Sequence, residues 1–322
     1  MRKIQIHPST TWEFAMSHSS RTARSTVRSI ACRGAFAIAC SVLAAGAALA
    51  EDAAPPAPAL TGHVDLVSRY ILRGVTSTYG PAAPLGNAGA DAPESDKPAL
   101  QWGADWSHPS GLYLGYFGST VNYSYKRLGE SYADRSVTDF QSKKSIENDL
   151  YGGYNGKAGD FGYTVGLTGY VYFNGKHSSA VETKLALSYG DFTLAAQTLL
   201  DDVIWGNRGD TYWTLNYVKP LPYDLTLTGS LGYYTYRKEG KYLGTRDTAA
   251  GANCPAGQSF FDNGCLPGGA PSSGAFRHLI VGVTQPIGAT GLTWGVQGIV
   301  GGKNRYGVNQ KSQLVATISY GF

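Results

Sequence analysis

Apolar and polar residues alternate along most of this chain from about residue 60 to its end. The clearest case is the last strand-like segment, where one face is apolar and ends on an aromatic residue, while the other face is small and polar and is interrupted only by Val315. Successive side chains of a β-strand point to opposite faces, so this pattern predicts a strand with one apolar face. The apolar face consists of Leu314, Ala316, Ile318, Tyr320 and Phe322, and the polar face of Gln313, Thr317, Ser319 and Gly321.

The same alternation predicts about twelve strands. They lie near 61–74, 98–108, 111–123, 145–156, 161–173, 180–189, 191–201, 210–218, 224–236, 276–285, 291–301 and 312–322. The gaps between them alternate in length, with tight even gaps and longer odd gaps, the longest being 75–97, 124–144 and 237–275. Short turns at one end and long loops at the other, on an even number of strands, are typical of outer-membrane barrels. A β-sandwich explains each strand separately but not this rhythm. We therefore predict an all-β fold, a transmembrane antiparallel up-and-down β-barrel over residues 61–322.

The N-terminal region has the features of an export signal. Four arginines, Arg21, Arg24, Arg28 and Arg33, precede an apolar stretch at 34–49 that ends in small residues before Glu51. Such a basic, apolar and small-residue sequence predicts a signal peptide over 1–50, with Met16 as an alternative start, followed by a short periplasmic linker at 51–60. The predicted location is the bacterial outer membrane, with its lipid as the surroundings of the barrel.

The charge of the chain changes when this leader is set aside. The chain has 27 Lys and Arg against 23 Asp and Glu, and the first 50 residues hold six of the former and one of the latter. The remainder therefore has 21 basic and 22 acidic residues, a net charge of −1, and no basic stripe that would indicate nucleic-acid binding. No apolar run after residue 50 approaches the ~18 residues of a transmembrane helix.

Two cysteines remain after the leader. Cys254 and Cys265 lie in one Gly- and Pro-rich segment, and in an oxidising compartment this spacing predicts a local disulfide. A tetrahedral zinc site needs further His or Cys ligands, which this segment lacks, so we predict no metal site. We also expect no cofactor.

The polar faces of the predicted strands carry charges that we expect to line the lumen, because a Lys or Arg facing lipid at the midplane costs about 2–4 kcal/mol. Asp65, Arg69 and Arg73 follow an i, i+4, i+8 spacing in the first predicted strand. The other candidates are Gln101, Asp105, Glu147, Asp149, Glu182 and Lys184. If the arginines face the acids, they create a transverse field typical of a charge-selective constriction. The alternative is that these groups pair and fill the barrel as a structural network.

Three segments resemble the TorF family of bacterial outer-membrane porins. They are 60–76, 98–113 and 145–154, and the shorter 187–190 is similar to a fourth family segment. The resemblance implies an outer-membrane barrel. Barrels of this membrane typically end on an aromatic residue, so the likeness also implies that Tyr320 and Phe322 form an assembly signal read by the barrel-assembly machinery. The chain departs from the family at Arg69, where an acid is more usual, and in its enlarged loops at 75–97 and 237–275.

The leading functional hypothesis is passive diffusion of small hydrophilic solutes, without catalysis. Twelve strands ~4.7 Å apart and tilted by ~40° give a backbone radius of roughly 12 Å, which leaves a narrow lumen lined by side chains. A barrel enzyme acting on lipid or peptide is one alternative, but the histidines after the leader (His63, His108, His177 and His278) lie in no catalytic motif. A surface-recognition barrel that binds a partner through loop 237–275 is the other.

Overall fold

The computed structural model describes residues 7–9, 33–35, 58–74, 97–140, 142–267 and 270–322. The predicted signal peptide and most of the predicted loop 75–97 lie outside these residues. Within the first 50 residues, only β1 (His7–Ser9) and β2 (Arg33–Ala35) are described, and they pair in parallel.

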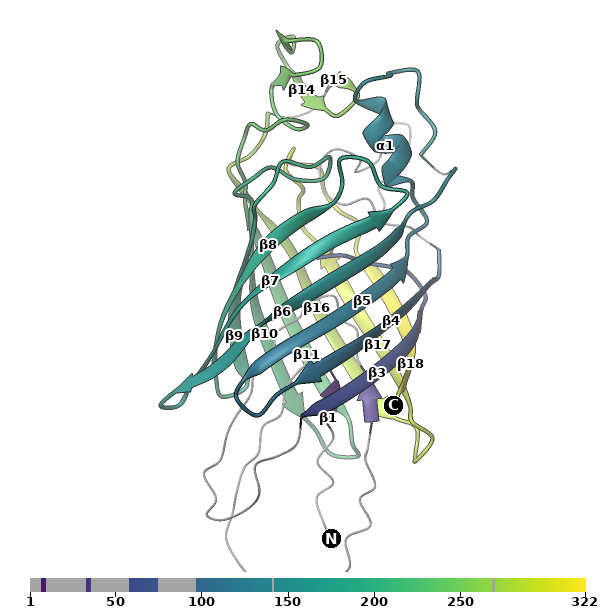
Figure 1. Cartoon of the computed structure of the whole chain (residues 1–322), viewed down its shortest axis with the longest axis vertical. Coiled ribbons are helices and arrows are strands. Elements are labelled where there is room, and N and C mark those ends of the chain that lie inside the picture. The colour runs from purple at the N-terminus through teal and green to yellow at the C-terminus, as the bar shows by residue number, and fades with distance from the viewer. Residues whose placement is uncertain (1–6, 10–32, 36–57, 75–96, 141, 268–269) are drawn as a thin grey trace, which may run out of the picture.

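The remaining architecture is a closed barrel of twelve antiparallel strands, as the alternation predicts (Figure 1). Each strand pairs with its neighbours in the sequence, except that β11 is followed by β16 because β12 to β15 lie in a loop. The strands are β3 (Ala59–Val67), β4 (Ala99–Ser107), β5 (Leu112–Thr120), β6 (Ile146–Ala158), β7 (Phe161–Phe173), β8 (Ala180–Tyr189), β9 (Phe192–Leu199), β10 (Thr211–Pro220), β11 (Thr226–Thr235), β16 (Gly274–Pro286), β17 (Leu292–Gly301) and β18 (Gln313–Gly321).

The barrel closes between its last and first strands. β18 pairs with β3 through a register that sets Thr317 opposite Val67 and Gly321 opposite His63. One residue further, Gly62 and Phe322 exchange two backbone hydrogen bonds of 2.8 and 3.0 Å. Closure leaves no free sheet edge in the wall, which is the condition for a β-structure to cross a bilayer.

The two faces of the wall differ as the sequence predicts. On β8, Leu185 is 53% exposed while the adjacent Lys184 is 2% exposed, and on β18 the exposed Leu314, Ile318 and Tyr320 alternate with buried inward residues. An apolar outer face and a polar inner face suit a barrel surrounded by lipid. In the part of the chain that the structure describes, no α-helix has the length and apolar character needed to cross a bilayer.

The first strand is shorter than its pattern predicts. β3 ends at Val67, not near residue 74, because the Ser68 hydroxyl accepts the Ala316 N–H at 3.0 Å, where a continuing ladder would use the Ser68 carbonyl. Such local side-chain bonds compete with strand pairing. Beyond Ser68 the chain leaves the wall, and Tyr70, Leu72 and Arg73 are buried.

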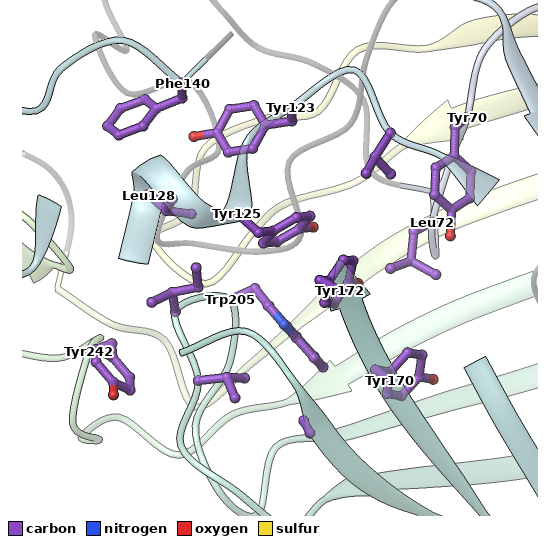
Figure 2. Close-up of a cluster of buried hydrophobic side chains, with 14 of the residues drawn as sticks. Tyr70, Leu72, Tyr123, Tyr125, Leu128, Phe140, Tyr170, Tyr172, Trp205 and Tyr242 are labelled. Carbon is purple, nitrogen blue, oxygen red and sulfur yellow. The ribbon is translucent and has the colours of Figure 1, made fainter. Parts of the chain in front are cut away.

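The long loops gather at the barrel end opposite the C-terminus (Figure 1). Segment 124–144, predicted as a loop, contains α1 (Tyr125–Ser131), whose N-cap Ser124 accepts the Arg127 N–H at 3.1 Å. Aromatic side chains pack around this helix (Figure 2), and the ring centres of its first residue, Tyr125, and of Tyr172 on β7 are 4.1 Å apart. The loop end of the barrel therefore contains a packed cluster of buried side chains.

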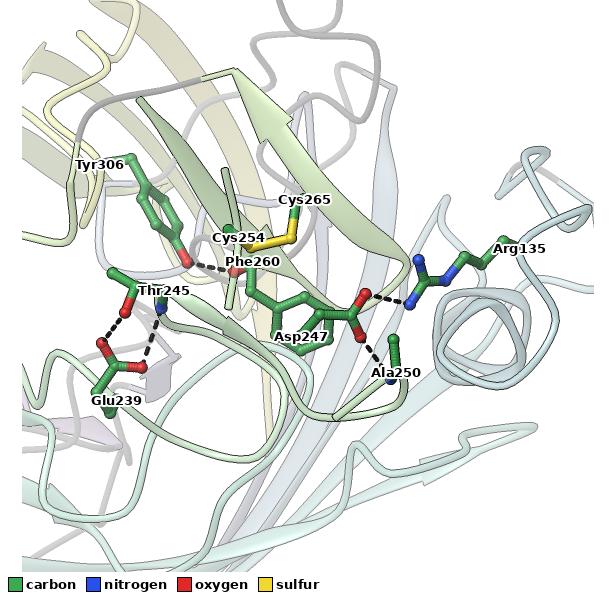
Figure 3. Close-up of a disulfide and its surroundings, with 9 residues drawn as sticks. All are labelled: Arg135, Glu239, Thr245, Asp247, Ala250, Cys254, Phe260, Cys265 and Tyr306. Carbon is green, nitrogen blue, oxygen red and sulfur yellow. Dashed lines mark hydrogen bonds and ion pairs between the residues drawn. A yellow bond between two sulfur atoms is a disulfide. The ribbon is translucent and has the colours of Figure 1, made fainter. Parts of the chain in front are cut away.

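The longest loop carries two small hairpins and the predicted disulfide. Its strands are β12 (Arg246–Asp247), β13 (Ala252–Asn253), β14 (Gln258–Phe261) and β15 (Gly264–Pro267). Cys254 and Cys265 are bonded, with their Cα atoms 5.5 Å apart (Figure 3). The Tyr306 hydroxyl donates to the Phe260 carbonyl at 2.9 Å, and Arg135 pairs with Asp247, so the hairpins are also tied to neighbouring loops.

Reduction of the Cys254–Cys265 disulfide should loosen this loop and leave the barrel intact. A bridge that closes so short a loop contributes ~2–3 kcal/mol in the chain-entropy model, whereas the wall closes through its own hydrogen bonds. We expect unchanged heat-modifiable migration on a gel together with faster proteolysis within residues 237–275. Loss of the heat-modifiable form on reduction would show that the bridge supports the wall.

Candidate functional site

The inward face of one side of the barrel carries most of its charged side chains. Asp65 on β3, Asp105 on β4, Glu147 and Asp149 on β6, and Glu182 on β8 all point inward, as do Gln101 and Lys184. The other side is different, because β9 to β11 and β16 to β18 contain no Asp or Glu. The inward residues there include Thr214, Asn216, Ser230, Thr284, Thr293, Thr317 and Ser319, and one buried cation, Arg277 on β16. The interior is thus polarised between an acidic wall and a wall whose strands contain no acidic residue.

Toward the end of the barrel that bears the C-terminus, the inward charges are hydrogen-bonded in small groups. His63 Nδ1 lies 2.9 Å from Asp65 Oδ2, and the Tyr151 hydroxyl donates to Asp105 Oδ1. Gln101 Nε2 donates to Ser119 Oγ at 3.3 Å. The first bond lies within β3, the second joins β4 and β6, and the third joins the adjacent strands β4 and β5, so all three stay within the acidic wall.

Toward the outer loops, Arg73 forms the densest set of polar contacts. Its Nη1 lies 2.9 Å from Glu182 Oε1, its Nη2 pairs with Glu182 Oε2, and both guanidinium nitrogens also donate to tyrosine hydroxyls. Those hydroxyls belong to Tyr234 at 2.7 Å and Tyr170 at 2.9 Å. The guanidinium carbon lies 4.8 Å from the centre of the Tyr212 ring. Forked pairing of this kind matches the planar geometry of both ions.

Arg73 connects three parts of the wall that are evenly spaced around the barrel. Residues 68–74 follow β3, Tyr170 belongs to β7, and Tyr234 belongs to β11; in the ring of twelve strands each of these is four steps from the next. Arg277 on β16 donates from Nε to the Arg73 carbonyl at 3.1 Å. Segment 68–74, which we call the strut, therefore crosses the interior and is fixed at its tip.

The predicted alignment of Asp65, Arg69 and Arg73 on one strand face is wrong, because β3 ends before Arg69. Arg69 donates to Gln313 at the start of β18, at the outer rim of the wall, and is only partly buried. Arg73 has a φ of 54° and Gly74 one of 69°, a left-handed pair that turns the strut. Only Arg73 of the two arginines reaches the acidic wall.

Arg305 is a third buried arginine, after Arg73 and Arg277, and the sequence pattern does not predict its burial. Arg305, in the loop between β17 and β18, pairs with Asp210, donates to the Arg237 carbonyl at 2.8 Å, and lies 4.5 Å from the Tyr236 ring centre. Burial lowers the pKa of this guanidinium, but the charge of Asp210 and neighbouring groups outweighs that effect, so its pKa lies above its ordinary value. Nothing in the alternation marks Arg305, because it lies outside the strands.

Between Arg73 and Arg305 stands a column of tyrosine rings. Tyr212 and Tyr234 have ring centres 5.1 Å apart, and Tyr234 and Tyr236 stack at 4.9 Å with an interplanar angle of 7°. Arg73 lies over the first ring and Arg305 over the last. The i, i+2 spacing of Tyr234 and Tyr236 at the end of a predicted strand is the one sequence signal for this column.

The histidines and the outer loops offer no complete catalytic arrangement among the described residues. His63 contacts Asp65, His108 accepts a hydrogen bond from Ser110 in an exposed turn, and His278 bonds the Tyr212 hydroxyl at 2.7 Å. His177 stacks on Tyr242 instead of bonding a serine, and partial burial with nearby Lys176 and Lys241 lowers its pKa. The described residues also contain no cluster of three or more His, Cys, Asp or Glu suited to a metal ion.

One carboxyl in the longest loop is buried without a side-chain hydrogen-bond partner among the described residues. It belongs to Asp262, in the turn between β14 and β15. Burial raises the pKa of this carboxyl well above its ordinary value.

Comparison with solved structures returns other barrels at low similarity. A KdgM porin shares 9% identity, with 81% of this chain and 99% of that chain covered and a TM-score of 0.42. The outer membrane phospholipase A from Escherichia coli shares 11% identity, with 82% and 97% covered and a TM-score of 0.37. OccK1 of Pseudomonas aeruginosa shares 10%, with 73% and 59% covered and a TM-score of 0.32. A search of curated proteins finds no match.

The family comparison is more direct. A model of the Gcw_chp family, described as bacterial proteins of unknown function, matches residues 50–261, which is more than half of the chain. The likeness to the TorF family is thus confined to individual segments and does not supply the family name. The chain belongs to the Gcw_chp family of bacterial proteins.

Proposed function

We propose that this protein is an outer-membrane channel for passive diffusion of small hydrophilic solutes through a narrow, charged lumen. The observation that carries the proposal is the contrast between the two faces of one closed wall. Aliphatic and aromatic side chains face outward, while Asp, Glu, Lys, Arg and hydroxyl side chains face inward.

The dimensions restrict the solutes to small ones. Twelve strands enclose a backbone radius of roughly 12 Å, and inward side chains occupy several ångströms of it. The strut and the tyrosine column narrow the outer half further. In the proposed channel the solute passes the part of the β16 to β18 wall where inward side chains such as Thr284, Thr293 and Ser319 are small.

The test is electrical recording of the purified protein, without the predicted leader, in a planar lipid bilayer. We expect stable, small conductance steps in salt and saturable flux of small polar solutes into proteoliposomes. If protein whose gel mobility shows it to be folded gives no conductance steps, the channel proposal is wrong. Assays of phospholipid and peptide hydrolysis on the same sample test the enzyme alternative. Conductance measured after deletion of residues 237–275 tests the surface-recognition alternative.

Replacing Phe322 by Ala should reduce the amount of barrel assembled in the outer membrane. Tyr320 and Phe322 both lie on the outward face at the closing seam, with their ring centres 6.2 Å apart, where an assembly factor can reach them. The comparison is Leu314→Ala, a similar loss of apolar surface on the same face at the far end of β18. Equal membrane yields for the two variants, measured by immunoblot, would argue against a special role of the terminal aromatic.

A further inference from the structure

The contacts of Arg73 have the form of a carboxylate-binding site that is already occupied. The guanidinium forks onto both oxygens of Glu182, and the Tyr170 hydroxyl donates to Glu182 Oε2 at 2.9 Å. The two side chains are 5% and 2% exposed. The site thus has a bidentate cation, one hydroxyl donor to the anion, a second hydroxyl from Tyr234 on the cation, and an aromatic ring beneath.

The Arg73–Glu182 ion pair does not join two neighbouring strands of the wall. The arginine comes from the strut in the interior, whereas the carboxylate comes from the wall, so the pair stands across the space that a solute must pass. The Arg73 backbone is held separately through its carbonyl by Arg277. The arginine therefore keeps its place if Glu182 swings away.

Arg73 would still have acidic neighbours if Glu182 moved away from it. Glu147 and Asp149 on β6 both interact electrostatically with Arg73. Glu147 also accepts a hydrogen bond of 2.6 Å from Tyr70 in the strut. A buried ion pair is weak evidence for a purely stabilising role, since desolvation offsets most of its attraction.

The outer mouth favours the approach of anions. Leaving aside Arg73, the described outer segments together contain 16 Lys and Arg against 9 Asp and Glu, whereas the short turns at the other end contain three Asp and no Lys or Arg. An excess of positive charge at the entrance raises the local concentration of anionic solutes. The described outer segments are 68–74, 97–98, 121–140, 142–145, 174–179, 200–210, 236–267, 270–273 and 302–312, and the turns are 108–111, 159–160, 190–191, 221–225 and 287–291.

We propose that Arg73 is a binding site for the carboxylate group of a small organic anion, and that Glu182 occupies this site until the solute replaces it. The carboxylate of the solute replaces that of Glu182 on the same two guanidinium nitrogens, so the buried Arg73 is never left without a counter-ion. Glu182 then acts as an internal competitor that keeps the empty lumen closed around Arg73. This inference rests on the proposed channel and names its solute class.

The experiment is the Glu182→Gln variant, tested for binding and for conduction. Gluconate and acetate are titrated into the folded protein in detergent by calorimetry, and carboxylate currents are recorded in bilayers. An internal carboxylate competes at an effective concentration in the millimolar range or above, so its removal should tighten gluconate binding roughly tenfold or more. The half-saturating concentration for gluconate current should fall in the same proportion, and Arg73→Gln should abolish gluconate binding.

Three comparisons make this result decisive. Asp160→Asn, in an exposed turn, removes one negative charge outside the lumen and should leave gluconate binding at the wild-type level. If Glu147→Gln tightens binding as much as Glu182→Gln, the effect is general electrostatics and the site assignment is wrong. If Glu182→Gln binds gluconate no better than wild type while both proteins conduct chloride, the binding-site inference is wrong and the channel proposal stands. If neither protein conducts, the channel proposal is wrong. Calorimetry then shows by itself whether Arg73 binds a carboxylate.

Discussion

Replacing Arg73 by Gln is expected to destabilise the barrel more than any other change of a single polar side chain that we consider. Gln cannot neutralise Glu182, and removing one member of a buried ion pair costs about 3–5 kcal/mol because the other charge stays buried. The same change releases two tyrosine hydroxyls from the strut. The free energy of unfolding, measured by urea titration in lipid vesicles, should fall by that amount.

The substitution should also alter ion selectivity. Without Arg73, Glu147, Asp149 and Glu182 dominate the outer half of the lumen, so the reversal potential in a salt gradient should shift toward cations. The double variant Arg73→Gln with Glu182→Gln should recover part of the lost stability, since no unpaired charge remains in that pair.

Arg69→Gln provides the matched control for both measurements. Arg69 is the neighbouring arginine, contacts Gln313 at the rim, and is partly exposed, so its loss should cost only about 0–1 kcal/mol. A loss of stability as large as that of Arg73→Gln would show that the strut is not fixed by Arg73. An unchanged reversal potential for Arg73→Gln, with conductance intact, would place Arg73 off the solute path.

Introducing Arg at the outward position 185 should have the second largest effect. Leu185 lies in the middle of β8 and points away from the lumen, so Leu185→Arg places a charge in lipid near the midplane at a cost of about 2–4 kcal/mol. The measurement is again urea unfolding in vesicles, followed by tryptophan fluorescence.

The control for this change uses the same strand and face at a different depth. Tyr189 is the last residue of β8 and is also outward, and an Arg near the membrane interface costs only about 0–1 kcal/mol. We therefore expect Tyr189→Arg to be nearly neutral. Equal losses of unfolding free energy for Leu185→Arg and Tyr189→Arg would contradict the assignment of Leu185 to the midplane and Tyr189 to the membrane interface.

The wall of the barrel could be predicted from the sequence because its physical signal is local. In β8, the neighbours Lys184 and Leu185 must face opposite environments, and a period of two records this along the strand. The strand number and closed antiparallel fold follow from repeating that local rule, and the structure confirms them. The same reasoning holds for the disulfide, because Cys254 and Cys265 belong to one short segment.

The contacts of Arg73 could not be predicted from the sequence, because its partners are distant in the chain. The alternation through Tyr70 and Leu72 continues that of β3, yet the chain leaves the wall at Ser68, where a hydroxyl replaces a ladder bond. Only the closed ring of strands then brings Arg73 to Glu182, 109 positions away, and to Tyr234, 161 positions away. The sequence determined which wall side chains face inward, because burial follows the strand period. The closed ring determined which of them meet, because it brings β7, β8 and β11 to the segment that follows β3.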